Sequence, residues 1–268
     1  MPLGIAPVEC ADPERRLLFT VHNRVMTATV VLVHGAWHGA WCFDRVVPLL
    51  AEVGVPAVAV DLPGHGDDPG PFTDLHGDAD RVRSILDTID GDVVLLGHSY
   101  GGAVITEAGV HSSVTHLVYL CALALDDGES CAAAAVAETS DLSFEGRPSL
   151  ADGWLTHPDG TTTLTPEGAA ACLYNDCDQE TVEWALAQLG PQPMPNLGQV
   201  PDAIAWRTRP SSYIVGAEDK TIHPGLQRVL ARRCTESIEW PTGHSPFASR
   251  PKAVGALLQS LATDVPKR

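Results

Sequence analysis

One serine of this chain stands where a nucleophile could be presented. Ser99 lies in Gly97-His-Ser-Tyr-Gly-Gly102, after the apolar run Val93–Leu96 and before the helix-compatible stretch Ala103–Ala108. The glycines two residues before and two residues after the serine permit a turn in which a Cβ would clash. A strand that ends in such a turn and continues as a helix lifts the serine hydroxyl above the sheet in a strained, exposed position. The motif therefore predicts a nucleophile at Ser99.

Two later residues are candidates to complete a catalytic triad with Ser99. A serine hydroxyl is a weak nucleophile until an adjacent base takes its proton, and that base needs a carboxylate to orient it. Asp219 follows one strand-like stretch and His244 follows the next, so acid and histidine come after the serine in the required order. Asp126 and Asp127 also follow a strand-like stretch and are the rivals for the acid, but Asp219 is favoured.

Two backbone amides are expected to stabilise the negative charge that develops when the serine attacks. Tyr100 directly follows the nucleophile at the start of a helix and supplies one N–H group. Ala36 supplies the other, from a loop that follows the first predicted central strand. Because losing one such donor costs about 10²–10³ in rate, this loop matters nearly as much as the triad.

Four polar residues beside these motifs are interpreted as structural. His34 and His38 have the spacing of some metal pairs, but they lie in a glycine-containing loop and not on a helix. We therefore expect them to brace the oxyanion loop by hydrogen bonds and to bind no metal. His98 is expected to pack or hydrogen-bond beside the nucleophile, and Asp61 is expected to shape the turn Asp61-Leu-Pro-Gly-His-Gly66.

Short apolar segments alternate with helical patterns along most of the chain, which predicts parallel strands joined by crossover helices. The expected strands are Thr29–Val33, Ala57–Val60, Val93–Leu96, His116–Cys121, Ser212–Val215 and Ser237–Trp240. Apolar residues at helical spacing predict helices over residues 75–89, after Pro224 and over residues 254–261, and an alanine-rich helix is expected over Cys131–Ala137.

The fold class that these elements predict is α/β, with a mainly parallel central sheet, helices on both faces and a helical cap inserted after the sixth strand. The core comprises residues 26–125 and 209–268, and the cap comprises residues 126–208, where the strand–helix alternation breaks. Residues 1–25 form either an N-terminal extension or a leading hairpin, and a hairpin is favoured for residues 16–27.

The composition limits the partners of the protein. The chain has 17 basic and 34 acidic residues and a net charge of −17, which argues against nucleic acid and anionic membranes as partners. It contains no run of about 18 apolar residues that would predict a membrane span. Seven scattered cysteines without a C-x-x-C motif predict reduced thiols in a cytoplasmic protein. A monomer and a homodimer are both open.

Four segments of the chain occur together: His34-Gly-Ala-Trp-His-Gly-Ala-Trp41, Asp61-Leu-Pro-Gly-His-Gly66, Gly97-His-Ser-Tyr-Gly-Gly102 and Gly243-His244. Together they resemble the α/β-hydrolase fold family, and in particular the small esterases related to plant methylesterases and hydroxynitrile lyases. Residues 28–125 match well and residues 210–262 moderately, whereas the insertion matches only through Cys172-Leu-Tyr-Asn-Asp-Cys177. The resemblance implies that Ser99 is the nucleophile, His244 the base, Asp219 the orienting acid and the insertion a cap over the acyl pocket. It also implies that Ala36 and Tyr100 are the oxyanion donors.

Two positions separate the esterases from the lyases within this resemblance. The lyases carry a threonine at the position of Gly35, and a lysine, which stabilises the cyanide leaving group, at the position of Ser245. The resemblance therefore implies a serine carboxylesterase that acts on small to medium carboxylic esters through an acyl-serine intermediate and needs no cofactor or metal. Hydroxynitrile lyase or lactonase chemistry and a non-catalytic small-molecule receptor are the alternatives.

Five apolar residues are candidates for the substrate pocket. Trp37 is the first, because it directly follows the oxyanion residue. The others are Leu123, Leu125, Trp154 and Trp184. Ordinary packing of the cap explains each of them equally well when it is taken alone.

Overall fold

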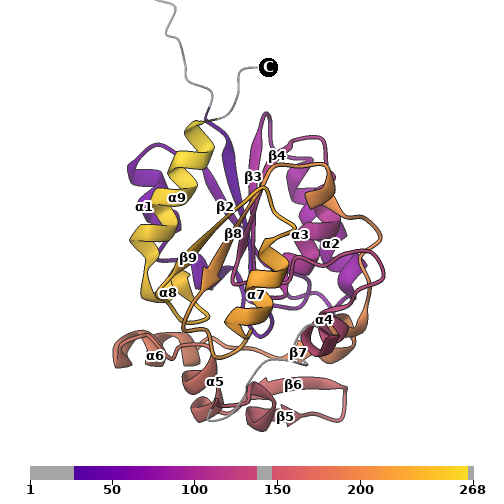
Figure 1. Ribbon diagram of the computed structural model, residues 1–268. Helices are drawn as coiled ribbons and strands as arrows, with labels where there is room; N and C mark the ends of the chain where they lie inside the picture. Colours follow the sequence, from indigo (N-terminus) through magenta and orange to yellow (C-terminus); the bar gives the residue numbers. More distant parts are fainter. Residues whose placement is uncertain (1–26, 138–146, 265–268) are drawn as a thin grey trace, which may run out of the picture.

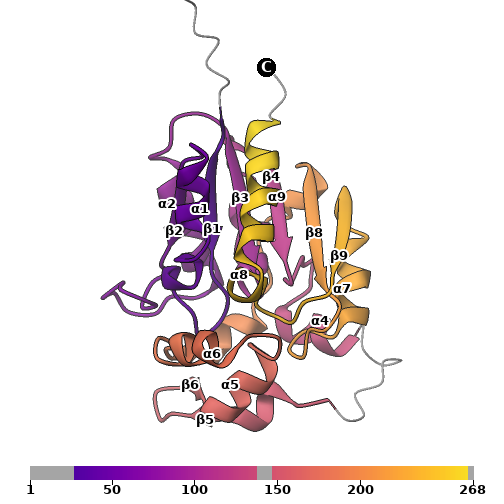
Figure 2. The same ribbon diagram turned by 90° about the vertical axis from the view of Figure 1, so that its left-hand side faces the viewer.

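Within the described residues, six parallel strands form the central sheet (Figure 1), and Figure 2 shows them in the order β2-β1-β3-β4-β8-β9. The computed structural model describes residues 27–137 and 147–264. The strands of this sheet are β1 (Thr29–Val33), β2 (Ala57–Val60), β3 (Val93–His98), β4 (Val114–Leu120), β8 (Ser211–Gly216) and β9 (Glu236–Trp240). The predicted α/β fold class is confirmed, and each strand begins and ends within two residues of its predicted bounds.

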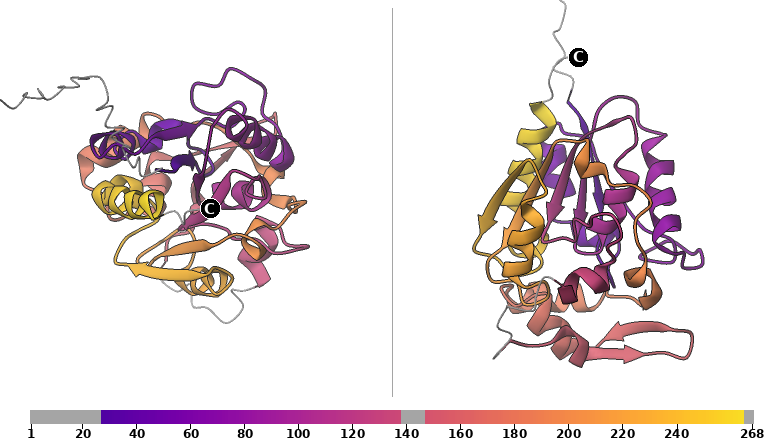
Figure 3. Two further views of the ribbon diagram at one scale, coloured as in Figure 1. Left: turned by 90° about the horizontal axis from the view of Figure 1, so that it is seen from above. Right: turned by 45° about the vertical axis from the view of Figure 1, so that its right-hand side comes forward.

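Helices cover both faces of the sheet, which is why its central strands read as unbroken apolar runs. Along β1, Val31 and Val33 pack in one core cluster, whereas Val30 and Leu32 pack in the other. The helices of the first cluster are α2 (Leu75–Leu86), α3 (Gly101–Ala108) and α7 (Pro224–Ala231). Those of the second, on the opposite side of the sheet (Figure 3), are α1 (Val47–Glu52) and α9 (Pro251–Thr263).

The direction of the strands decides where the predicted site residues meet. The carboxyl ends of parallel strands lie at one edge of a sheet, so the loops that follow the strands lie together there. Ala36 follows β1, Ser99 follows β3, Asp219 follows β8 and His244 follows β9. The fold therefore brings residues that are far apart in the sequence to a single edge.

The predicted cap segment follows β4, which is the fourth strand of the described residues, and lies beyond one end of the central sheet (Figure 2). It contains the helices α4 (Cys131–Ala137), α5 (Pro166–Cys172) and α6 (Gln179–Leu186). It also contains an antiparallel sheet of three strands, β5 (Trp154–Thr156), β6 (Thr161–Leu164) and β7 (Gln192–Pro193). The sequence predicts only helices in this segment. The three strands were missed because two to four residues are too few to show the alternation of apolar and polar residues that is typical of a strand.

The other helical elements of the described chain are short. They are η1 (Ala40–Phe43), η2 (Leu150–Gly153), η3 (Met194–Gly198), η4 (Ala205–Arg207) and α8 (Pro246–Ser249). No helix within residues 27–137 or 147–264 is long and apolar enough to cross a membrane. The extension or leading hairpin expected over residues 1–25 lies outside the described residues.

The turn after β3 is built from close contacts between backbone segments. A Cβ on Gly97 would lie 2.4 Å from the carbonyl oxygen of Gly101, and a Cβ on Gly101 would lie 2.5 Å from the carbonyl oxygen of His34. No Cβ can occupy either position without moving backbone atoms. Both glycines of the elbow motif are therefore needed for packing, as the sequence predicts.

Replacing Gly97 with alanine should lower the free energy of unfolding by about 1–3 kcal/mol, because the added methyl group must push the turn apart. Urea unfolding measures the change. Gly198→Ala is the matched control, since a Cβ at Gly198 would meet no heavy atom within 4 Å. Equal stability of the two variants would contradict the tight packing inferred for the turn.

Candidate active site

Ser99 has a left-handed backbone conformation, with a φ of 52°, which costs a residue other than glycine about 1–3 kcal/mol. Its amide donates to the carbonyl oxygen of Leu120 at 3.3 Å. Its own carbonyl oxygen accepts from the amides of Gly102 and Leu123 at 3.0 and 3.1 Å. These bonds to β4, to α3 and to the segment after β4 hold the strained residue, whose surface is half-buried.

Asp219 and His244 form a buried pair. Nδ1 of His244 donates to Oδ2 of Asp219 at 2.8 Å, and the exposed fractions of the two side chains are 1% for His244 and 0% for Asp219. Oδ1 of Asp219 accepts from the amides of Thr221 and Ile222 at 2.7 and 2.9 Å, and Oδ2 also accepts from the side-chain amide of Gln227 at 2.7 Å. Donors on both oxygens therefore fix the carboxylate against the imidazole.

The second ring nitrogen of His244, Nε2, is buried and has no hydrogen-bond partner among the described residues. The ring of His98, which directly precedes Ser99, lies against the ring of His244 with 4.7 Å between the centroids. Nε2 of His98 also donates to the carbonyl oxygen of His244 at 2.9 Å. The imidazole of His244 therefore lies beside the elbow. In enzymes without bound substrate, the hydrogen bond between a nucleophile and its base is often long and shortens only when substrate binds.

The two amides predicted for the oxyanion hole have no acceptor in the described part of the chain. Neither Ala36 nor Tyr100 donates its backbone N–H group to another described residue. Trp37, which follows Ala36, has a φ of 63°, so the loop turns sharply at this point. Both N–H groups are thus available to an anion, which is the property that oxyanion donors need.

His34 and His38 use both of their ring nitrogens in hydrogen bonds. Nδ1 of His34 donates to the carbonyl oxygen of Gly35 at 2.8 Å, and its Nε2 accepts from the amide of Leu62 at 3.1 Å. Nδ1 of His38 donates to the carbonyl oxygen of Ala36 at 2.7 Å, and its Nε2 accepts from the hydroxyl of Tyr174 at 2.7 Å. The two rings therefore brace the oxyanion loop, and neither has a nitrogen left for a metal.

Asp61 and the rival acids occupy other places. Asp61 accepts from the amides of Ala40 and Asp67 at 2.6 and 3.2 Å and thereby shapes its turn. Asp126 forms an ion pair with Arg207. Asp127 is exposed, and its amide donates to Asp126 at 2.8 Å. The acid that contacts His244 in the described structure is Asp219.

Three of the predicted pocket residues belong to one core cluster, which contains Trp37, Leu123 and Leu125. The ring of Trp154, on β5, lies 6.1 Å from the ring of Trp37 between centroids and is 37% exposed. The ring of Trp37 therefore lies between the core and the strand of the cap that carries Trp154. Of these four residues, Trp37 and Trp154 contact each other directly, and Leu123 and Leu125 share the core cluster of Trp37.

Trp184 lies with a different group of residues. Its ring packs edge-on against Trp41 with 5.4 Å between the centroids, and the guanidinium of Arg45 lies 4.7 Å from the ring centroid. Trp184 thus packs against the core cluster on the opposite face of the sheet. A cavity of about 500 Å³, bordered by Trp41, Asp44 and Asp61 among others, includes none of the predicted site residues.

Gln227 is a site residue that the sequence did not single out. It is fully buried on α7, where its Nε2 donates to Asp219 and to the carbonyl oxygen of Ile222, while its Oε1 accepts from the amide of Gly216 at 3.0 Å. It therefore ties the acid to the end of β8. The signal for it was a polar residue beside Leu226 on the apolar face of a predicted helix.

The segment Cys172–Cys177 connects the cap to the loops of the site. Tyr174 bonds to His38, as described above, and Asn175 donates to the carbonyl oxygen of Glu218 at 3.1 Å. The hydroxyl of Thr221 donates to the carbonyl oxygen of Cys172 at 2.9 Å. The one part of the cap that carries the family resemblance thus contacts both the oxyanion loop and the loop of Asp219.

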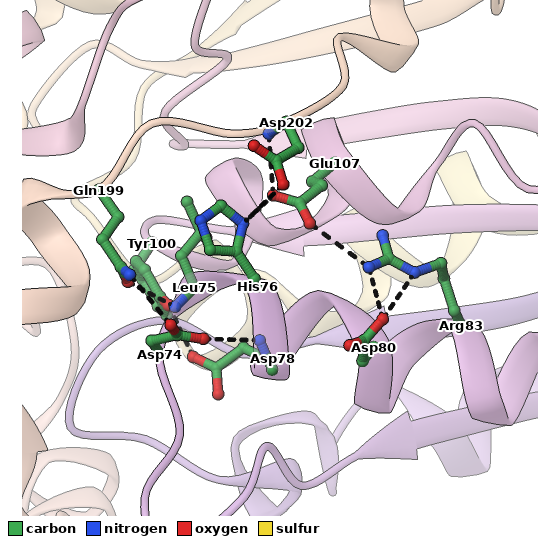
Figure 4. Close-up of polar contacts among 11 residues, drawn as sticks. Asp74, Leu75, His76, Asp78, Asp80, Arg83, Tyr100, Glu107, Gln199 and Asp202 are labelled. Atoms are coloured by element: carbon green, nitrogen blue, oxygen red, sulfur yellow. Dashed lines mark hydrogen bonds and ion pairs between the residues drawn. The ribbon is translucent and has the colours of Figure 1, made fainter.

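A second polar cluster lies on α2 and α3 (Figure 4). Nδ1 of His76 lies 2.9 Å from Glu107 and 3.6 Å from Asp202, and the guanidinium of Arg83 lies 3.4 Å from the other oxygen of Glu107. A metal ion here would have to compete with the positive charge of Arg83 for Glu107. We interpret the cluster as an ion-pair network that joins α2, α3 and the chain near Asp202.

Comparison with known proteins places the chain in a family. Residues 30–257 match the model of the alpha/beta hydrolase family. Methylesterase 18 of Arabidopsis thaliana is 26% identical over 268 residues, covering 88% of this chain and 97% of the relative, and pheophorbidase of Raphanus sativus is 29% identical over 242 residues, covering 85% and 91%. A solved pyrethroid hydrolase from Sphingobium faniae JZ-2 superposes with a TM-score of 0.72 at 25% identity, covering 88% of this chain and 98% of that one.

The chain therefore belongs to the alpha/beta hydrolase family. The fold, the elbow and the parallel sheet are those of an enzyme of this family, and the resemblance to small esterases is confirmed.

Burial makes the histidines beside the site a source of pH dependence. Burial lowers the pKa of His38 to about 4, and it lowers the pKa of His34 and His98 well below the ordinary value. Between about pH 4 and pH 6.5 the unfolded chain thus binds more protons than the native one, so stability falls as the pH falls through this range. His38 alone should account for a loss of about 2 kcal/mol between pH 7.5 and pH 5.

Urea unfolding of wild type and His38→Phe at these two pH values tests this expectation. The variant is less stable at both, because it loses the hydrogen bonds to Ala36 and Tyr174, but its loss between pH 7.5 and pH 5 should be smaller by about 2 kcal/mol. The same pH dependence in both proteins would contradict a neutral His38.

Proposed function

We propose that this protein is a serine carboxylesterase that hydrolyses small to medium carboxylic esters. The observation that carries the proposal is the buried Asp219–His244 pair beside the strained turn of Ser99, in which Nε2 of His244 has no hydrogen-bond partner among the described residues. The similarity to a protein named methylesterase, over nearly the full length of both chains, supports an ester as the substrate class.

The proposed reaction uses the residues of the site in two half-reactions. Oγ of Ser99 attacks the ester carbonyl carbon while Nε2 of His244 takes the hydroxyl proton, and Asp219 stabilises the imidazolium through Nδ1. The amides of Ala36 and Tyr100 bind the oxyanion of the tetrahedral intermediate. The intermediate collapses, the alcohol leaves with the proton from Nε2, and the acyl group stays on Ser99. Water then attacks the acyl carbonyl carbon while His244 takes its proton, the bond to Oγ of Ser99 breaks, His244 returns the proton to Oγ, and the carboxylic acid leaves.

Two local features favour hydrolysis over the lyase reaction. A Cβ on Gly35 would lie 2.8 Å from Cβ of Ser99 and 2.9 Å from Nδ1 of His98, so a threonine would collide with the elbow. Ser245 follows His244 and is fully buried, so no ammonium group stands at this position to stabilise a cyanide ion. Lactone opening uses the same steps as ester hydrolysis and stays within the proposed chemistry.

The surroundings of the site belong to the same proposal. Trp37, Trp154, Leu123 and Leu125 are proposed to line the acyl pocket, and Trp184 is proposed to support the cap through Trp41. The cytoplasm is the proposed location, on the scattered cysteines of the sequence. Residues 126–208 are proposed as the cap and residues 26–125 and 209–268 as the hydrolase core.

Ser99→Ala should lower the turnover of activated acyl esters by about six orders of magnitude, because the acyl-serine can no longer form. The assay uses p-nitrophenyl esters of graded acyl length, aromatic methyl esters and mandelonitrile. Ser249→Ala, which removes a hydroxyl without a hydrogen-bond partner among the described residues, serves as the control. Near-normal ester turnover by Ser99→Ala would disprove the assignment, and faster cyanide release than ester turnover by wild type would favour the lyase.

Asp219→Asn should lower kcat by about 10⁴-fold, because the amide no longer selects the histidine tautomer that leaves Nε2 free to accept a proton. Asp126→Asn tests the rival acid and should leave kcat within about twofold, since its carboxylate is paired with Arg207 at the surface. Steady-state kinetics on one activated ester measures both. A large loss in Asp126→Asn with little loss in Asp219→Asn would reverse the assignment of the acid.

A further inference from the structure

The oxyanion loop is tied to the cap at Trp37. The amide of Trp37 donates to Oε1 of Gln192 at 3.3 Å, and its carbonyl oxygen accepts from the amide of Gly190 at 2.9 Å. Its indole N–H group donates to the carbonyl and hydroxyl oxygens of Thr162 at 3.2 and 3.1 Å. The backbone and side chain of the residue after Ala36 are therefore fixed from the small antiparallel sheet of the cap.

The side chain of Tyr100 is tied to the same part of the cap. Its hydroxyl donates to Oδ2 of Asp78 at 2.6 Å, and Asp78 is fully buried on α2 (Figure 4). Nδ2 of Asn196 donates to the same oxygen at 3.2 Å and to the carbonyl oxygen of Thr73 at 2.9 Å. Burial and the neighbouring carboxylate raise the pKa of Tyr100, so its hydroxyl keeps the proton that it donates.

The two side chains of the cap that make these contacts, Gln192 and Asn196, lie in one short stretch, residues 190–196, which we call the proline-rich strip. Its sequence is Gly-Pro-Gln-Pro-Met-Pro-Asn. Three prolines fix φ at alternate residues, so the strip loses little conformational freedom on folding and behaves as a stiff element. Gln192 is fully buried, its Nε2 donates to the carbonyl oxygen of Pro193 at 3.1 Å, and its Oε1 also lies 3.0 Å from Nε2 of His65.

We propose that Gln192 and Asn196 are positioning residues that hold the two oxyanion amides in register, Gln192 through Trp37 and Asn196 through Asp78 and Tyr100. The inference rests on the proposed function. An oxyanion hole works only when its donors already point at the developing charge, and a small misplacement of such groups costs large factors in rate. The cap thus contributes to the chemical step as well as covering the pocket.

The test compares Gln192→Leu and Asn196→Leu with wild type. Each should lower kcat for p-nitrophenyl butyrate by about 10- to 100-fold and change KM by less than about threefold, because the misplaced amides act on the oxyanion and not on the bound ester. A trifluoromethyl ketone provides a second readout. Ser99 adds to its carbonyl carbon, the serine proton passes to His244 and the carbonyl oxygen becomes an oxyanion, so its inhibition constant should rise in parallel with the loss in kcat.

Gln199→Leu is the matched control. Gln199 lies just beyond the strip and also joins the cap to the core, because its Oε1 accepts from the amide of Leu75 at 2.7 Å and its Nε2 donates to Asp74 at 3.1 Å (Figure 4). It has no hydrogen bond to Trp37, Tyr100 or Asp78. This variant should lose stability, measured as Tm, but keep kcat and the inhibition constant within about twofold.

The outcomes separate the two proposals. Equal kcat in Gln192→Leu, Asn196→Leu and Gln199→Leu, all assayed below their Tm, would overturn the positioning role while the esterase assignment stands. A rise in KM at unchanged kcat would also overturn it, since the residues would then act on substrate binding. Ester turnover that is absent in wild type or unaffected by Ser99→Ala would remove the proposed function and this inference with it.

Discussion

The left-handed backbone of Ser99 is the constraint on which the rest of the site depends. A conformation that costs about 1–3 kcal/mol persists only when the surroundings over-determine it. Here the surroundings are close-packed backbone segments. A Cβ added at Gly97 would collide with the backbone of Gly101, and one added at Gly101 would collide with the carbonyl oxygen of His34. A Cβ added at Gly35 would collide with the Cβ of Ser99 itself. The same contacts that force the strained turn also place the oxyanion loop against it. The turn at Ser99 and the loop of Ala36 are therefore a single packed unit.

Burial determines the charge of the histidines around the turn of Ser99. His34, His38 and His98 belong to the unit formed by the elbow and the oxyanion loop, and desolvation keeps each of them neutral near pH 7. Neutral rings can brace backbone carbonyl oxygens without adding charge next to His244, the proposed base. In the proposed reaction, the buried carboxylate of Asp219 stabilises the proton that His244 gains. This division of roles among histidines follows from which ring nitrogens have partners.

Much of the fold was predictable because its signals are local. The inner strands of the central sheet are apolar runs that lie between turn residues, whereas the edge strand β9 is mostly exposed and carries two glutamates. Helix α7 begins at Pro224, where a proline suits the first helical turn. The cap was predicted less well. Its strands span two to four residues and its contacts are made by single polar side chains, such as Gln192 and Asn196, that carry no periodic pattern. Gln227 was overlooked for the same reason.

The sequence by itself determined the order of the chemistry: a serine between glycines, then an aspartate and a histidine after successive strands, with Gly35 and Ser245 where a lyase would have other residues. Residue type and spacing are properties of the linear sequence, so no structure is needed to recognise them. Only the tertiary structure decided that Asp219 and not Asp126 meets His244, that both nitrogens of His34 and His38 are occupied, and that the proline-rich strip reaches Trp37 and, through Asp78, Tyr100. Those outcomes depend on distances between loops from different strands, and packing of the whole sheet and cap sets those distances.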